Sequence, residues 1–139
     1  MPQKLTERDI AKTCSDFLEL DGWRPIKMEP ISRREWGKGT GEKGQADYLY
    51  VRYKAICKDH PDKMVAMKKG VLCGYPWVEL LWIEWKSAKG KPKPHQLDWH
   101  RAERARGALT WIAGVDFPAS IEGFMDHYRH SGLLRRTGL

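Results

Sequence analysis

The chain has 139 residues, of which 41% are hydrophobic, and its 25 Lys and Arg outnumber its 18 Asp and Glu, giving a net charge of +7. This length suits one domain, and the apolar content, with seven Trp, favours a globular protein over a disordered chain. The basic balance favours polyanionic partners, chiefly nucleic acid, although many basic domains bind none.

Cysteine usage and hydropathy exclude several classes of protein. Cys14, Cys57 and Cys73 are an odd, sparse set, which is not typical of a disulfide framework and predicts a reducing cytoplasm. Cys57 lies close to His60, but no second closely spaced pair completes a zinc site, so ordinary thiols are expected. The N-terminus lacks an apolar signal core, and the most apolar run, residues 71–85, is too short and too charged to cross a membrane.

The first predicted element is a helix. Apolar residues recur at helical spacing from Ile10 to Leu18 and predict a helix over residues 7–20. Thr6, with an acidic residue three positions later, is a start signal, and Gly22 marks the end of the helix.

A glycine- and charge-rich loop follows at residues 33–45. Residues 46–53 are rich in Tyr, Leu and Val and predict a strand, and residues 78–86 carry the strongest strand signal in the chain. Between them, residues 54–76 predict a long, partly irregular connection that is a candidate insertion.

The second half of the chain predicts a helix over 94–106, a strand over 108–115, a helix over 118–130 and a tail, 131–139, that frays. The order is therefore helix, two or three strands, helix, strand, helix. It predicts one α/β domain over residues 1–139, with a central mixed sheet flanked by helices.

Glu84 and Lys86 are the first candidate site residues. They are two positions apart on a predicted strand, so both point to one face, with Leu80 and Trp82 behind them. Both faces of so apolar a strand look buried, and an unpaired buried ion costs on the order of several kcal/mol. The strand alone leaves a structural Glu–Lys pair and a functional site equally open.

Asp47 favours the functional alternative, because it opens the preceding strand directly after the glycine-rich loop. Two carboxylates on neighbouring strand ends form an oxygen-rich site that suits Mg²⁺ or Mn²⁺. Lys86 beside them can orient the attacking water and offset charge in the transition state. Glu7, at the buried edge of the first helix, either adds a carboxylate or is only a favourable charge at the helix N-terminus.

The ordered set Gly44-x-x-Asp47, then Glu84-x-Lys86, then Gln96 ten residues after the lysine, resembles the PD-(D/E)XK nuclease superfamily, and within it the VRR-NUC family. The resemblance extends along nearly the whole chain and includes the stretch EWKSAKGKPKPHQ. It implies a single restriction-endonuclease-like domain with metal-dependent nuclease activity.

The resemblance also implies roles for the matching residues. Asp47 and Glu84 would ligate Mg²⁺ or Mn²⁺ together with the carbonyl of Trp85, and Lys86 would serve the attacking water. Gln96 would position the Lys86 region or a phosphate; without the family pattern it is a solvated residue at a helix start.

Glu7 would assist the metal directly or through water. The chain departs from the family at Ala46, where a proline is usual, in the bulky Trp85, and in the length of the connection between Asp47 and Glu84.

Basic residues flank the predicted site on both sides. The candidates for phosphate contacts are Arg33, Arg34, Lys38 and Lys43 in the first loop, and Lys89, Lys91 and Lys93 in the second turn. Solvated lysines are the alternative for each run taken alone. Trp36 would either wedge against a base at a branch point or anchor its loop to the core.

The expected function is a structure-selective DNA endonuclease that acts on branched or duplex DNA. Stand-alone domains of this family resemble Holliday junction resolvases, which act as homodimers, and exposed aromatic residues would supply the dimer face. By family analogy, the expected setting is the cytoplasm of a bacterial or phage-infected cell. The alternatives are a nicking, flap or restriction-like nuclease, a catalytically silent DNA-binding domain, and a structural protein with an internal Glu84–Lys86 pair.

Overall fold

The computed structural model describes residues 4–28, 42–57, 60–64, 67–68, 71–72, 74–136 and 138–139, and between residues 54 and 77 only the backbone of the strands. The elements in chain order are α1 (Glu7–Leu20), β1 (Arg24–Lys27), β2 (Tyr48–Cys57), β3 (His60–Met64), β4 (Met67–Lys68), β5 (Val71–Leu72), β6 (Gly74–Glu84), α2 (Pro94–Ala105), β7 (Leu109–Ile112) and α3 (Ile121–His130).

Helix α1 begins at the predicted signal. The Thr6 hydroxyl accepts a hydrogen bond from the Asp9 backbone N–H (3.2 Å), and the Asp9 carboxylate accepts one from the Thr6 N–H (2.9 Å). This reciprocal capping box satisfies two N–H groups that the first turn would otherwise leave without partners. Gly22 follows the last turn with φ of +92°, the left-handed conformation that ends many helices. The predicted range 7–20 is confirmed.

The central sheet is mixed. Strands β1, β2, β6 and β7 lie side by side in that order, and β3 pairs with β2. The β1–β2 and β2–β6 pairs are antiparallel, whereas β6 and β7 are parallel and are joined through α2. This arrangement, with its three helices, confirms the predicted α/β class in one small domain.

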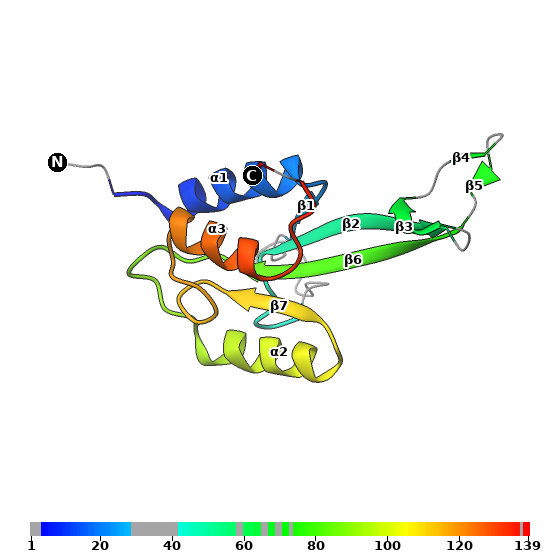
Figure 1. Cartoon of the computed structure of the whole chain (residues 1–139). Coiled ribbons are helices and arrows are strands. Elements are labelled where there is room, and N and C mark those ends of the chain that lie inside the picture. The colour runs from blue at the N-terminus through cyan, green and yellow to red at the C-terminus, as the bar shows by residue number, and fades with distance from the viewer. Residues whose placement is uncertain are drawn as a thin grey trace, which may run out of the picture.

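Strands β2 and β6 form a hairpin that is longer than the sequence predicted. The ladder runs from Tyr48 opposite Ile83 to Cys57 opposite Gly74, so both ends of the connection 54–76 continue the strands. The hairpin extends beyond the helices toward β3 (Figure 1). Asp47 and Glu84 therefore lie at the opposite end of the sheet from β3.

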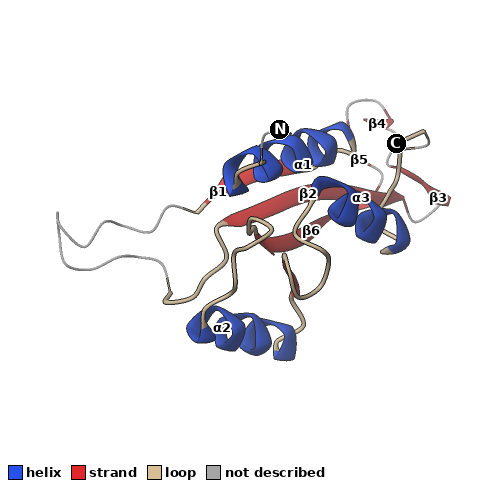
Figure 2. Cartoon of the chain, turned by 90° about the vertical axis from the view of Figure 1, so that its left-hand side faces the viewer, coloured by secondary structure: helices blue, strands red, loops and turns tan. Residues whose placement is uncertain are grey.

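Helices α1 and α3 cover one face of the sheet, and α2 lies on the other (Figure 1, Figure 2). On the α3 side the Trp85 ring lies 5.0 Å from that of Phe124, in an edge-to-face arrangement favoured by aromatic rings. Exposed aromatic residues were expected to supply a dimer face. Four tryptophans are too buried to contribute to such a face, each being at most 8% exposed: Trp23, Trp85, Trp99 and Trp111.

The face of β6 that bears Glu84 is not buried along its whole length. Leu80 is 46% exposed and Val78 56%, and Tyr53 opposite Val78 is 57% exposed. The prediction that both faces of the strand are buried holds near Glu84, which is 0% exposed, and is wrong at Val78 and Leu80.

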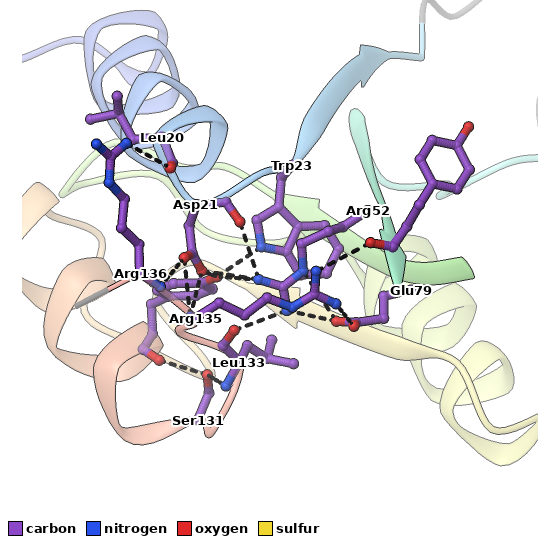
Figure 3. Close-up of polar contacts among 11 residues, drawn as sticks. Leu20, Asp21, Trp23, Arg52, Glu79, Ser131, Leu133, Arg135 and Arg136 are labelled. Carbon is purple, nitrogen blue, oxygen red and sulfur yellow. Dashed lines mark hydrogen bonds and ion pairs between the residues drawn. The ribbon is translucent and has the colours of Figure 1, made fainter. Parts of the chain in front are cut away.

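A buried polar cluster, which the sequence did not suggest, joins α1 to the C-terminal segment (Figure 3). The Asp21 carboxylate accepts hydrogen bonds from Arg52 Nη1 (3.0 Å), the Arg135 N–H (3.0 Å), the Arg136 N–H (2.7 Å) and the Tyr128 hydroxyl. The expectation that the tail frays is wrong for residues 133–136, whose backbone is bound to the body of the domain.

Arg52 lies at the centre of the same cluster. Its guanidinium donates to Glu79 Oε2 (2.6 Å) and to the Leu133 carbonyl (2.9 Å), and it stacks 4.3 Å from the centre of the Trp23 ring. The Arg52 side chain is only 3% exposed, so these partners replace nearly all of its hydration.

Candidate functional site

Glu84 ends β6 and is completely buried. Its Oε1 accepts a hydrogen bond from the Lys86 ammonium at 2.6 Å, and its Oε2 accepts the Asp47 backbone N–H at 3.3 Å. The Lys86 side chain is 12% exposed and so lies between the buried carboxylate and the solvent. The shared face that alternation predicted for Glu84 and Lys86 is thus confirmed by a direct contact.

Asp47 stands directly before β2 and is partly buried. Its carbonyl accepts the Met28 N–H at 2.7 Å, which continues the pairing of β1 with β2 past Lys27. Because its N–H also donates to Glu84, the backbone of Asp47 is bound on both sides, to Met28 through its carbonyl and to the end of β6 through its N–H. The structure therefore brings together Asp47, Glu84 and Lys86, the three residues at the centre of the predicted site.

Gln96 joins the same site from α2. Its Nε2 donates to Glu84 Oε1 at 2.5 Å, while its Oε1 accepts the Lys93 backbone N–H at 2.9 Å and so caps the helix. The Gln96 side chain thus binds the Glu84 carboxylate with its amide nitrogen and the start of α2 with its amide oxygen. The alternative that Gln96 is merely a solvated helix-start residue is wrong, because its side chain is engaged by Glu84.

Burial controls the electrostatics of the two carboxyl groups. It raises the pKa of Glu84; the Lys86 ammonium opposes this effect and the charge of Asp47 adds to it. Burial likewise raises the pKa of Asp47, against the lowering effect of the charges of Lys86 and Lys27. Two partly dehydrated carboxylates that repel each other are a site at which a cation would relieve the repulsion.

Lys27 is a residue that sequence reasoning missed. It ends β1 opposite Tyr48, the neighbour of Asp47, and its charge acts on the Asp47 carboxyl. The pairing of β1 with β2 places it there, and no sequence spacing signals that pairing.

Glu7 and Trp85 are the remaining residues that were expected at the metal. Glu7 is partly buried at the first turn of α1, and no hydrogen bond joins it to the other site residues among the parts of the chain that the structure describes. Trp85 directs its indole into the core, where Nε1 donates to the Tyr50 hydroxyl at 3.0 Å. The bulk of Trp85 between Glu84 and Lys86 therefore serves the core.

The predicted phosphate-binding residues divide into two groups. Those that the structure describes are all exposed: Lys43, Lys89, Lys91 and Lys93. Three others, together with Trp36, lie outside the described residues: Arg33, Arg34 and Lys38. The exposed lysines stand on the two segments next to Asp47 and Lys86, and their contact with phosphates stays a prediction.

Within the described residues, no group of three or more His, Cys, Asp or Glu side chains forms a ready metal cage. The donor set at the site is two carboxylates. It fits Mg²⁺ better than a softer metal, since Mg²⁺ is commonly bound through one or two carboxylates and retains several waters. Cys14 is buried and free, with a pKa raised to about 12 by burial, so it is an inert core thiol.

Comparisons with known proteins add no assignment. No family model, no curated protein and no solved structure matches the chain. Among the helices in the described ranges, none has both the length and the apolar composition needed to cross a membrane.

Proposed function

We propose that this protein is a metal-dependent DNA endonuclease of the PD-(D/E)XK type, close to the VRR-NUC family. The observation that carries the proposal is the meeting of Asp47, Glu84 and Lys86 at neighbouring strand ends, with Glu84 completely buried. Both carboxyl groups have raised pKa values, and such perturbed groups cluster at functional sites more often than elsewhere.

Asp47 and Glu84 are the residues that would hold Mg²⁺ or Mn²⁺, with the Trp85 carbonyl as a further oxygen. When bound, the cation would polarise a phosphoryl oxygen and offset the negative charge that develops there. Burial of Glu84 favours this role, because electrostatic contacts are stronger where water is excluded.

The reaction would be hydrolysis of a phosphodiester, in which a water oxygen bonds to phosphorus and the bond to one sugar oxygen breaks. Lys86 would orient the water and stabilise charge on the phosphoryl oxygens. Gln96 would fix the Glu84 carboxylate through the contact at its Oε1. Glu7 would assist from the first turn of α1.

The substrate we propose is branched DNA, with the protein acting as a homodimer in the manner of a Holliday junction resolvase. The exposed lysines beside the site support contact with phosphates, which carries affinity without sequence preference. A nicking, flap or restriction-like nuclease would use the same residues, because the substrate is then set by the surrounding segments.

Two alternative functions involve no catalysis. A silent DNA-binding domain would gain nothing from carboxylates placed next to its phosphate-binding lysines, since they repel DNA. A purely structural Glu84–Lys86 pair accounts for the 2.6 Å contact but does not require Asp47 as a second partly buried carboxylate beside it.

The test is cleavage of a labelled four-way junction, a flap and plain duplex, each with Mg²⁺ or Mn²⁺, by wild type and Glu84→Ala. Symmetric cuts in the junction that require the metal and vanish in the variant are expected. Cuts confined to flap or duplex would keep the nuclease and remove the resolvase assignment.

Failure of folded wild type to cleave any substrate in either metal would contradict the nuclease. Tighter DNA binding by Glu84→Ala would then identify a silent DNA-binding domain. A large loss of stability in the same variant, with no DNA binding by wild type, would instead identify a structural ion pair.

A further inference from the structure

The segment that leads into Asp47 is fixed to helix α2 by two contacts. Trp99 Nε1 donates a hydrogen bond to Glu42 Oε2 at 2.8 Å. Gly44, with φ of +87°, lies so close to the helix that a Cβ would come 2.1 Å from the His95 carbonyl oxygen. The approach is therefore open only to glycine, and both contacts tie the segment to the same helix.

Trp99 is in turn packed on the strand that carries the other carboxylate. It is 8% exposed, and its ring lies 5.2 Å from that of Trp82 in an edge-to-face arrangement. Trp82 is two residues before Glu84 on the same face of β6. One indole thus contacts the Glu84 strand with its ring and the Asp47 segment with its N–H.

We propose that Glu42 and Trp99 form a latch that positions Asp47 against Glu84. The reaction served by this positioning is the one proposed above, and in that respect the inference rests on it. Glu42 acts through the chain that leads to Asp47, and Trp99 acts through Glu42.

Two properties of the latch enable it to hold the Asp47 segment in place. A hydrogen bond from an indole N–H to a carboxylate is charge-assisted and is stronger than a neutral one. The donor is held rigidly by its packing on Trp82, whereas the acceptor lies in a glycine-containing segment that has much conformational entropy to lose. A functional constellation must be held to within roughly 0.5 Å, which a glycine-rich segment needs outside support to achieve.

The most direct measurement is hydrogen exchange of the Asp47 amide in the metal-free protein, because this N–H donates to Glu84 Oε2. Glu42→Ala removes the acceptor, and Trp99→Phe removes the N–H while retaining an aromatic ring against Trp82. Each change is expected to speed exchange about tenfold, the effect of losing one charge-assisted hydrogen bond.

The double variant is expected to exchange no faster than either single variant, since both remove the same bond. Glu42→Gln keeps an acceptor oxygen and should lie between wild type and Glu42→Ala. Asp98→Ala is the matched control, because it removes an exposed carboxylate paired with Arg101 on the same helix and leaves the latch intact.

Calorimetric titration with Mn²⁺ gives a second readout. Glu42→Ala should weaken Mn²⁺ binding about tenfold, the lower end of what outer partners of a metal site contribute. Unchanged Asp47 exchange in both Glu42→Ala and Trp99→Phe would overturn the latch whatever the activity. Wild type that binds no Mn²⁺ and cuts no DNA would overturn the proposed nuclease, while faster Asp47 exchange in the variants would still support the latch.

Discussion

At the scale of single residues, the carboxyl groups of Asp47 and Glu84 lie close together and are both shielded from solvent, Asp47 in part and Glu84 completely. The folded protein raises the pKa of both carboxyl groups above their ordinary values. A carboxyl whose folded pKa is raised binds its proton more tightly in the folded state than in the unfolded one. Such a group lowers stability as pH rises from its unfolded pKa to its folded pKa, and the loss remains at higher pH.

Asp47→Asn is therefore expected to leave the protein as stable as wild type, or more stable, at pH well above the folded pKa of Asp47. The same change should lower DNA cleavage by more than the roughly 10- to 100-fold that outer partners of a metal contribute. Thermal unfolding at acidic and at neutral pH, together with the cleavage assay, measures both effects. A marked loss of stability at neutral pH would contradict the account of Asp47 as a dehydrated, repelled carboxylate.

At the scale of elements, the turn between β6 and α2 carries three exposed lysines directly after the site. A cation that neutralises a phosphate releases counterions, so the slope of log K against log salt reports how many phosphates the protein neutralises. If the lysines bind DNA, their removal should weaken binding of every DNA sequence to a similar extent.

The triple change of Lys89, Lys91 and Lys93 to Gln is expected to reduce that slope by about 0.9 for each phosphate that the variant no longer neutralises. Fluorescence anisotropy with labelled DNA over a range of salt concentrations measures it. A control with the same reduction in charge replaces cations that lie outside this turn: Lys12, Arg106 and Arg129. An equal effect in the control would show that net charge alone, and not this turn, drives binding.

Elements with strong local signals were predictable, and those that depend on distant contacts were not. Helix α1 matched its predicted bounds because its capping residues and apolar stripe are all local. Strand β1 carries Pro25 and only four residues, too little for a periodic signal, and its place is set by pairing with β2. The ends of β2 and β6 nearest β3 were not predicted, because backbone pairing between the two strands extends them and their composition does not signal a strand.

The same distinction applies to the candidate site. The types and spacing of Asp47, Glu84 and Lys86 were enough to predict that they meet, and Gln96 was identified only through a family pattern. The partnership of Glu42 with Trp99 spans 57 residues, and no periodicity signals it. Such a contact can be found only once the strands and α2 are placed.

At the scale of the whole molecule, the cluster around Asp21 and Arg52 connects α1, the hairpin and the C-terminal segment. Burial would raise the pKa of Asp21, but hydrogen bonds from Tyr128 and from the backbone of Arg136 and Arg135, with the charge of Arg52, lower it instead. Burial would also raise the pKa of Glu79, and contacts with Arg52 and Arg135 outweigh it and lower that pKa too. A lowered folded pKa contributes stability that is lost as pH falls through it.

Wild type is therefore expected to lose stability steeply in acid, over the range from the unfolded pKa of Asp, about 3.9, downward. Asp21→Asn should cost about 3 kcal/mol at neutral pH, because it removes one of the two carboxylates, Asp21 and Glu79, that pair with the buried Arg52 charge, and it should flatten the acid dependence. Urea unfolding at several pH values tests this. Asp98→Asn, in an exposed pair, should change stability by less than about 1 kcal/mol.

The position of this cluster in the chain bears on how the protein matures on the ribosome. Asp21 accepts hydrogen bonds from the Arg135 amide and the Tyr128 hydroxyl, and it is synthesised 114 residues before Arg135 and 107 residues before Tyr128. Until those residues emerge, the nascent polypeptide lacks several of the partners that surround the Asp21 carboxylate and the Arg52 guanidinium in the folded protein (Figure 3). The cluster can therefore be completed only after residues 133–136 have left the exit tunnel, and a chain stalled before that point should be a substrate for chaperones and proteases.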